Sequence, residues 1–357
     1  MNTLDKKISD AMHRIEDMYY STEGKCYVSF SGGKDSTVIL AIIRMCEEIY
    51  TIPKGGIKAV FCDTGIELGA TRDFVRWCKN SGWYSNIEII RPSKTFSYVL
   101  DNYGKPVKSK LKSEFIDRYQ KKDNLNAFHY LVMAENPNNG KKYAKSRIAD
   151  KDLHILSKRF DIKVSSKCCD FLKKKPFADW QKENDIKGYI TGIRSGEGGV
   201  RELNAIKRVE NGGKLCTMTK GNYIVKMPII DWTENDIEEF IKTYDMPLSK
   251  AYTEYDMKRT GCMGCPYSRT IAKDLEVLWN YEPQRYKASM FFLKDVYIAQ
   301  NIKLPFDENY EKEREAKWEQ DYTSMREEML KLYRPESRIL KRTNNVTKKE
   351  EQLQLEI

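Results

Sequence analysis

Residues 26–36 read CYVSFSGGKDS, and this stretch decides the fold of the chain. The run CYVSF (26–30) has the β-branched and aromatic residues of a short buried strand, and the apolar stretch from Ser36 onward has the pattern of a helix. Two glycines form a turn between them. A Gly-rich turn between a strand and a helix is typical of an anion-binding loop at the carboxyl end of a parallel strand.

Each residue type in this loop suits a phosphate group. Gly32 and Gly33 let backbone N–H groups approach an anion closely, and the following helix adds the partial positive charge of its N-terminus. Lys34 can neutralise phosphate oxygens, and Ser31 and Ser36 can donate hydrogen bonds. A Walker A loop is excluded, since it has four residues between its first Gly and the Gly-Lys pair. The alternative is a purely structural turn.

Three later runs carry the same strand signal: IKAVFCD (57–63), NIEIIRP (86–92) and GYITGIR (188–194). Helical patterns separate the runs, and strands that alternate with helices form βαβ units. The sequence therefore predicts an α/β fold with a doubly wound, mostly parallel sheet. A helical pattern also covers residues 272–333.

The composition is that of a folded protein, with 40% hydrophobic and 32% charged residues. Residues 1–20 show an amphipathic helical pattern and not a secretion signal, and no apolar run is long enough to span a bilayer. We therefore expect a cytoplasmic protein without a membrane partner. Thiols stay reduced in that compartment, so the nine cysteines are not expected to form a disulfide framework.

The positive charge is concentrated in one segment. Residues 105–175 hold 19 Lys or Arg against 8 Asp or Glu, a surplus of 11, whereas the whole chain has a net charge of +10. A basic segment of this kind indicates an anionic partner such as tRNA or DNA. The alternative is a solvated, lysine-rich insertion, because the segment has few aromatic residues for base stacking.

Further motifs follow the predicted strands, so their side chains should reach the same edge of the sheet as the loop. These motifs are Asp63-Thr64-Gly65 after the second strand, Gly192-Ile193-Arg194 with Arg201 after the fourth, and the run PIIDWTE (228–234) before a helix opened by Thr233 and Asp236. Taken alone, Asp63 could be a turn residue, and the arginines could pair with nearby glutamates.

The loop resembles the PP-loop of enzymes that split ATP between its α- and β-phosphates. Together, the four motifs resemble the phosphoadenosine phosphosulfate (PAPS) reductase family over about residues 20–270. This family includes sulfonucleotide reductases, the small sulfate adenylyltransferase subunit and DNA phosphorothioation sulfurtransferases. The resemblance implies an adenine nucleotide alpha-hydrolase-like domain over residues 1–270 with a basic insertion at about 105–175, a helical extension over 271–333, and a polar, mobile tail over 334–357.

The resemblance also implies roles for individual residues. ATP is the expected substrate, with Mg²⁺ held on its phosphates by Asp63. Lys34, Asp35, Asp63 and Arg194 are the expected catalytic residues. The expected nucleotide-binding residues are Ser31, Gly32, Gly33, Lys34, Asp35, Ser36, Asp63, Thr64, Gly65, Gly192, Arg194 and Arg201.

Four cysteines have the spacing of metal ligands. Cys168 and Cys169 are adjacent, and Cys262 and Cys265 form a CxxC motif followed by proline. A CxxC motif alone is compatible with redox chemistry or with zinc. Adjacent side chains rarely bind one ion together, so the pair favours a larger cluster over Zn²⁺. The CC…CxxC pattern resembles the iron–sulfur adenylyl sulfate (APS) reductases, which implies a [4Fe–4S] cluster on these four thiolates.

Three functions remain open from the sequence. The first is an ATP pyrophosphatase-type transferase that carries out adenylation or sulfur transfer to a nucleic acid or a small acceptor, with a sulfur-donor protein as partner. The second is an APS or PAPS reductase, but no cysteine follows Cys265 to supply the C-terminal nucleophile of those enzymes, and their PP-loop is commonly degenerate. The third is a non-catalytic binding module. The chain keeps the expected catalytic residues Lys34, Asp35 and Asp63, which argues against this third function.

Overall fold

The computed structural model describes residues 3–122, 124–136, 138–142, 144–195, 210 and 212–333. The chain forms two compact units, and each unit is made of two stretches of sequence. Unit 1 consists of Met1–Phe96 and Cys169–Met263, and unit 2 consists of Ser97–Cys168 and Gly264–Ile357.

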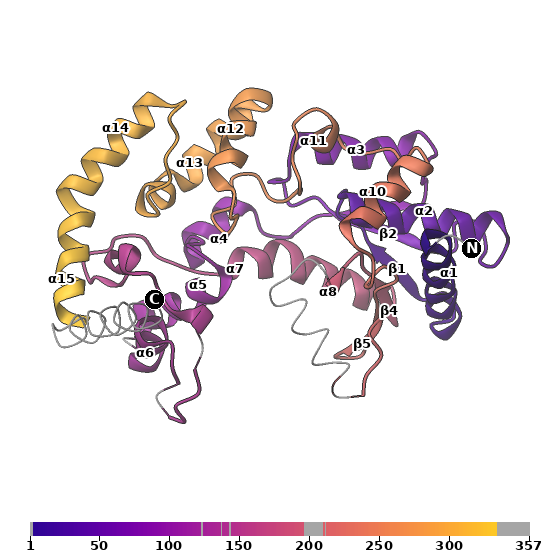
Figure 1. The fold of residues 1–357 in the computed structure, drawn as a ribbon, viewed down its shortest axis with the longest axis horizontal. Coiled ribbons are helices and arrows are strands. Elements are labelled where there is room, and N and C mark those ends of the chain that lie inside the picture. Colours follow the sequence, from indigo (N-terminus) through magenta and orange to yellow (C-terminus); the bar gives the residue numbers. More distant parts are fainter. Residues whose placement is uncertain are drawn as a thin grey trace, which may run out of the picture. The chain divides into compact units, whose positions relative to one another are not determined.

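Unit 1 is built on a six-stranded sheet in the order β3-β2-β1-β4-β6-β5 (Figure 1). The strands are β1 (Cys26–Ser29), β2 (Lys58–Cys62), β3 (Ile87–Ile90), β4 (Gly188–Ile190), β5 (Thr217–Lys220) and β6 (Tyr223–Lys226). Neighbouring strands are parallel except β5 and β6, which pair antiparallel. The predicted α/β fold with a mostly parallel sheet is confirmed, and β1 lies in the interior of the sheet.

Helices cover both faces of this sheet, as expected for a doubly wound fold. The helices of unit 1 are α1 (Thr3–Ser21), α2 (Lys34–Glu48), α3 (Gly69–Asn80), α8 (Lys175–Glu183), α10 (Glu234–Thr243) and α11 (Lys250–Thr253), and a π-helical turn, η3 (Asp170–Lys174), precedes α8. Val28 of β1 belongs to the core formed with α1, α2 and α10, whereas Tyr27 packs with Trp180 of α8 on the other face. Successive strand residues face opposite sides, so both faces of β1 are buried.

The β5–β6 hairpin was not predicted from the sequence. Its strands are joined by Gly221 and Asn222, and Gly221 has a φ of +59°. A two-residue Gly-Asn turn between short alternating runs is a recognised hairpin signal, so the stretch TMTKGNYIVK (217–226) did contain the information.

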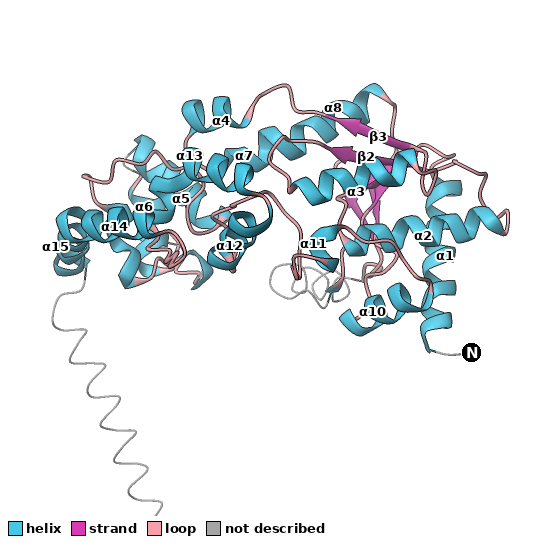
Figure 2. Cartoon of the chain, turned by 90° about the horizontal axis from the view of Figure 1, so that it is seen from above, coloured by secondary structure: helices cyan, strands magenta, loops and turns pink. Residues whose placement is uncertain are grey.

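The described elements of unit 2 are helical (Figure 2). They are α4 (Phe96–Tyr103), α5 (Lys110–Lys122), α6 (Leu125–Met133), η1 (Ala144–Ser146), η2 (Asp150–Leu156), α12 (Ile271–Tyr281), α13 (Pro283–Ala299), α14 (Glu308–Lys317), η5 (Trp318–Tyr322) and α15 (Thr323–Tyr333), and α7 (Lys167–Cys169) follows Ser166. The tail 334–357 lies outside the described residues. Within the described ranges, no helix has both the length and the apolar content that crossing a membrane requires.

Most of the basic segment belongs to unit 2. Residues 97–168 interrupt the sequence of unit 1 and form one compact unit with the C-terminal stretch. His154 shows why: its ring packs against Trp318 and Tyr322, and its Nε2 lies 2.8 Å from the carbonyl oxygen of Ala299. Lys105 likewise pairs with Asp295 at 2.7 Å. The core of unit 2 therefore requires both stretches of sequence.

His154 should make the stability of unit 2 sensitive to acid. Burial lowers the pKa of His154 to about 4, although the Ala299 carbonyl and Asp152 favour the charged form. An unfolded histidine titrates near 6.5, so the unfolded state binds the proton more tightly between pH 6.5 and 4. We expect the free energy of unfolding to be about 2 kcal/mol lower at pH 5 than at pH 7.5 through this residue alone. Urea unfolding followed by tryptophan fluorescence measures it.

A pair of variants isolates this contribution. His154→Leu should remove about 2 kcal/mol of the difference between the two pH values, whereas His13→Gln, which changes an exposed histidine, should retain it. Equal pH dependence in His154→Leu and the parent protein would show that His154 is not the residue responsible.

Candidate nucleotide-binding site

The loop after β1 requires glycine at Gly32. This residue has a φ of +71°, a conformation that side chains with a Cβ rarely adopt. A Cβ here would also lie 2.8 Å from Cγ2 of Thr71 and 3.0 Å from Cγ2 of Val75, both on α3. The loop is therefore packed tightly against α3, and α2 begins directly after it at Lys34.

Hydroxyl oxygens surround the backbone N–H groups of the loop. The N–H of Gly33 donates to Oγ of Ser31 at 3.3 Å, and the N–H of Lys34 donates to the hydroxyl of Tyr252 at 3.2 Å. The hydroxyls of Ser31 and Ser36 lie 3.0 Å apart. The first amides of α2 thus face oxygen acceptors, which is the same kind of partner that a phosphate would offer them.

The segment that follows β4 packs against the start of α2 through Gly192. A Cβ on this residue would lie 3.0 Å from the carbonyl carbon of Asp35 and 3.1 Å from the backbone N of Ser36. This close approach brings Arg194, two residues further on, to the loop. The sequence prediction that Gly192 and Arg194 reach the loop is consistent with this geometry. Arg201, the other predicted arginine, lies outside the described residues.

Two cations and two carboxylates form a network at the start of α2. Nε of Arg194 lies 2.8 Å from Oδ1 of Asp35, and its NH2 lies 2.6 Å from Oε2 of Glu234. Lys34 pairs with the other oxygen of Glu234. Arg194 is only 5% exposed, so its charge depends on these partners. The predicted catalytic residues Lys34, Asp35 and Arg194 therefore lie together.

The carboxylates of this network have shifted pKa values. Burial raises the pKa of Asp35, and the charges of Arg194 and Lys34 oppose this shift only in part. Burial would also raise the pKa of Glu234, but hydrogen bonds from Lys34 and Arg194 outweigh it, so that its pKa is lowered. Glu234 is thus the anion that holds both cations.

Glu234 is a site residue that sequence reasoning missed. It is the first residue of α10, directly after Thr233, whose side chain and that of Asp236 form the predicted capping box. That capping box is confirmed, and it fixes the position of Glu234 at the helix start. Its partner Lys34 is 200 positions away in the sequence, so no local pattern could have linked them.

Asp63 is held by arginines. Its Oδ2 lies 3.1 Å from NH2 of Arg72 and 3.9 Å from NH2 of Arg91. The backbone N–H and the hydroxyl of Thr64 both donate to Glu67, at 2.9 and 2.7 Å. Glu67 was not predicted, yet it is the carboxylate of this region that lines the cavity next to the loop. Any Mg²⁺ on Asp63 would compete with Arg72 for the same oxygen.

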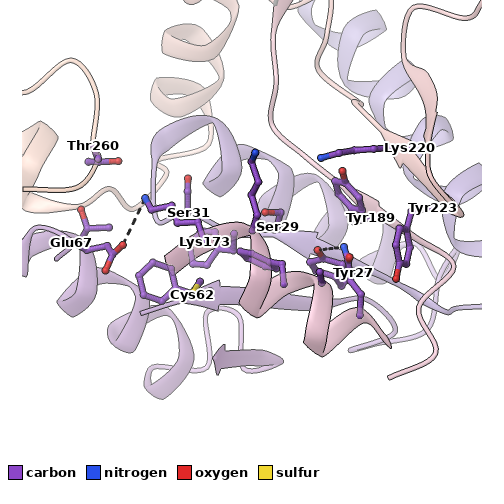
Figure 3. Close-up of a pocket in the computed structure, with 18 of the residues that line it drawn as sticks. Tyr27, Ser29, Ser31, Cys62, Glu67, Lys173, Tyr189, Lys220, Tyr223 and Thr260 are labelled. Carbon is purple, nitrogen blue, oxygen red and sulfur yellow. Dashed lines mark hydrogen bonds and ion pairs between the residues drawn. The ribbon is translucent and has the colours of Figure 1, made fainter. Parts of the chain in front are cut away.

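A cavity of about 670 Å³ lies within unit 1, beside the loop (Figure 3). At one end it is lined by Ser31, Thr260, Glu67, Cys62 and Lys173, and Figure 3 shows Lys173 directed toward Glu67. At the other end it is lined by Tyr27, Gln181, Tyr189, Lys220 and Tyr223. A partly apolar cleft with a few polar groups beside an anion-binding loop is the expected form of a small-molecule site.

None of the four predicted cysteine ligands forms a disulfide in the structure. Cys169 and Cys262 belong to unit 1, and both interact with the ammonium of Lys173. Cys168 and Cys265 belong to unit 2. Among the described residues, no three or more His, Cys, Asp or Glu side chains are gathered as a metal site. The ligand set therefore stays a prediction.

The CxxC motif contains a glycine, Gly264, that the backbone requires. Gly264 has a φ of +58°, and a Cβ on it would lie 2.4 Å from the hydroxyl of Tyr297. That hydroxyl donates to the carbonyl of Gly264 at 2.5 Å. Only glycine fits this position, so the chain turns sharply just before Cys265.

Part of the predicted basic surplus is neutralised by local ion pairs. Lys174 pairs with Asp170 at 2.9 Å and Lys175 with Asp179 at 3.0 Å. Among the described residues of unit 2, six more basic residues of the segment pair with carboxylates: Lys105, Lys108, Arg118, Lys121, Arg147 and Arg159. Nucleic-acid binding by residues 105–175 stays a prediction. Because several of its basic residues already pair with carboxylates, fewer positive charges are available to phosphate than the residue count suggests.

Comparison with known proteins decides the family. A family model described as the phosphoadenosine phosphosulfate reductase domain matches residues 25–128 and 109–268, which together cover more than half of the chain. The chain belongs to the PAPS reductase family. The match includes the loop, Asp63, Arg194, Glu234 and all four candidate ligand cysteines.

Two solved structures are similar to this member of the PAPS reductase family at low sequence identity. The phosphoadenylyl-sulfate (PAPS) reductase from Candida auris, in a phosphate complex, is 14% identical over 67% of this chain and 81% of its own, with a TM-score of 0.37. The U34-tRNA thiolase NcsA from Methanococcus maripaludis, with its [4Fe-4S] cluster, is 12% identical over 84% and 81%, with a TM-score of 0.34. No curated protein matches the chain.

Proposed function

We propose that the chain binds ATP at the loop 31–36, cleaves it between the α- and β-phosphates, and uses the activated adenylate for adenylation or sulfur transfer to a nucleic acid or a small acceptor. The observation that carries this proposal is the intact loop, with Gly32 at positive φ and the cations Lys34 and Arg194 at the start of α2.

The proposed chemistry follows from where charge develops. When pyrophosphate leaves, negative charge grows on its oxygens, and fixed donors and cations that face those oxygens lower the barrier. The first amides of α2, the hydroxyls of Ser31 and Ser36, and the ammonium of Lys34 supply such groups. Because Glu234 binds both Lys34 and Arg194, an incoming triphosphate would take over cations that Glu234 holds. Mg²⁺, with Asp63 as its predicted ligand, would neutralise further phosphate charge.

The cysteines fit a thiolate-bound cluster in their chemistry. Burial raises the pKa of the Cys262 thiol, and the ammonium of Lys173, which also interacts with Cys169, opposes this shift in part. Gly264 allows the CxxC turn. A [4Fe–4S] cluster on Cys168, Cys169, Cys262 and Cys265 would supply a site that holds sulfur or exchanges electrons. The residues of this chain would position that site, and a sulfur-donor protein would be the expected partner.

A second candidate is sulfonucleotide reduction, which the name of the family favours. Reduction needs a free thiolate that attacks the sulfur of APS or PAPS. Burial raises the pKa of Cys62 and Cys78 to about 12 and that of Cys26 to about 11, which suppresses their reactivity. Of the cysteines outside the predicted ligand set, Cys216 alone is more than slightly exposed. Sulfite formed from APS or PAPS with thioredoxin, and lost in Cys216→Ser, would establish this second function.

Lys34→Ala should weaken ATP binding by about 1–3 kcal/mol, the cost of losing a charge-assisted hydrogen bond to phosphate. Titration calorimetry with ATP and Mg²⁺ measures the affinity, and an assay for released pyrophosphate, with and without added tRNA or DNA, measures turnover. Turnover should fall with affinity, because Lys34 would contact the leaving group.

Lys25→Ala is the matched control for this experiment. Lys25 directly precedes β1 and forms a surface ion pair with Asp185, so its loss should leave ATP binding unchanged. ATP affinity that is the same in folded Lys34→Ala and Lys25→Ala proteins would refute the nucleotide site. ATP binding without pyrophosphate release under any condition would favour the non-catalytic module.

A further inference from the structure

The cavity of unit 1 has two chemically different ends, and the phosphate loop accounts for only one of them. We propose that the other end, lined by Tyr27, Gln181, Tyr189, Lys220 and Tyr223 (the tyrosine end), binds a nucleotide unit of the acceptor, with its base on the tyrosines and its phosphate at Lys220. This inference rests on the proposed function and identifies the acceptor class for the same cavity.

The tyrosine end is well separated from the loop. Tyr27 and Ser31 are four residues apart on β1 and its continuation, which corresponds to about 13 Å along an extended strand. The stretch between them is lined by Ser29 and Phe30. The cavity therefore extends along β1, away from the groups that would hold the phosphates.

The walls of the tyrosine end are aromatic and preorganised. The rings of Tyr27 and Phe177 are stacked at 5.9 Å with an angle of 17°, and the rings of Tyr27 and Tyr189 lie 5.8 Å apart. The hydroxyl of buried Tyr27 accepts a hydrogen bond from Nε2 of Gln181 at 2.8 Å. Flat walls with hydroxyl and amide groups at their edges suit a planar heterocycle that also forms hydrogen bonds.

Two side chains at the tyrosine end lack partners that comparable residues have. The lysines at or beside the neighbouring strands pair with carboxylates: Lys25 with Asp185, Lys58 with Glu88, Lys187 with Glu23 and Lys226 with Asp17. Lys220 has no ion pair, and Tyr223 no side-chain hydrogen bond or ring contact, among the residues that the structure describes. Figure 3 shows Lys220 extended over Tyr189, with Tyr223 beside them.

The solvent exposure of the tyrosine end favours a nucleotide of the acceptor, and not the adenine of ATP, as its occupant. Lys220, the last residue of β5, and Gly221 in the turn that follows are exposed, whereas Tyr27 is 1% exposed. A ring inserted here would stack inside the cavity while the group attached to it stays outside, next to Lys220. That arrangement suits a nucleotide that belongs to a longer strand or carries its own phosphate, because an ammonium at the opening pairs with phosphate.

The test measures two affinities in the full chain. Labelled single-stranded RNA and DNA of ten nucleotides and mixed sequence are titrated by fluorescence anisotropy, with an α,β-methylene analogue of ATP at saturation. The four unlabelled nucleoside monophosphates are tested as competitors, which distinguishes a strand from a free nucleotide. Calorimetry gives the affinity for the ATP analogue.

We expect Tyr223→Ala to weaken oligonucleotide or monophosphate binding about 5-fold or more, the loss of one stacked base, and Tyr223→Phe to have little effect. Lys220→Ala should reduce the slope of log K against log salt by about one. All three variants should bind the ATP analogue as the parent does.

Two results would overturn this inference while leaving the proposed function intact. A loss of affinity for the ATP analogue in Tyr223→Ala would place the base of ATP at the tyrosine end. Oligonucleotide and monophosphate binding that is absent, or is equal in Tyr223→Ala and Tyr223→Phe, would exclude a nucleotide acceptor there. Failure of the proposed function itself would appear separately, as ATP binding that does not depend on Lys34.

Discussion

Arg194→Ala should lower the free energy of unfolding by about 3 kcal/mol. Arg194 is buried and binds both Asp35 and Glu234, at 2.8 and 2.6 Å. Removing one partner of a buried ion pair leaves the other charge uncompensated, which is strongly destabilising. Such a change typically costs about 3–5 kcal/mol. Because the Glu234 side chain is partly exposed, water can solvate its charge, and we expect a loss at the lower end of this range. Urea unfolding at neutral pH measures the effect.

Two variants control for the loss of an arginine as such. Arg76→Ala removes an exposed arginine of α3 that pairs with Asp73 at 3.4 Å, and this change should cost less than about 1 kcal/mol. Arg194→Lys keeps the charge but not the planar fork of donors, so its stability should lie between the parent and Arg194→Ala. Equal losses in Arg194→Ala and Arg76→Ala would show that the network at the start of α2 contributes little to stability.

Anaerobically purified protein should be brown and contain about four iron atoms per chain, as expected for a cluster on four cysteine thiolates. Cys262→Ser should lose most of this iron, because three thiolates hold such a cluster less tightly. Iron and zinc analysis together with the visible absorption spectrum measures the result. The readout needs no knowledge of the acceptor.

Cys78→Ser is the matched control for the iron measurement. Cys78 is buried in α3 and outside the predicted ligand set, so its replacement should retain the iron. One zinc per chain in the parent protein would identify a structural zinc site instead. Iron that is equally lost or equally retained in the two variants would contradict the assignment of Cys262.

The sequence by itself determined the parallel sheet and its loop. The strands around residues 26–30, 57–63, 86–92 and 188–194 were found because hydrophobic runs, glycine turns and helix signals are local patterns. The loop was found because its chemistry is contained in six adjacent residues. The family followed from the order of such local motifs, and the match over residues 25–268 confirms it.

The tertiary structure alone decided which side chains meet. Glu234 binds Lys34 across 200 positions, and Tyr252 reaches the N–H of Lys34 across 218. Asp63, which the sequence offered as a metal ligand, is paired with Arg72, and Glu67 lines the cavity instead. These contacts depend on which distant segments of the chain pack together. Two charged residues that pair across 200 positions have no fixed spacing, so no pattern in the sequence indicates the pair.

The same reason explains the grouping of the basic segment. Its lysine content was plain in the sequence, but the aromatic core around His154 forms only when residues 97–168 fold together with the C-terminal helices. Several lysines and arginines that a count treats as available are then paired with carboxylates. Composition determines how many charges the chain has, and packing of distant segments determines which of them a partner can reach.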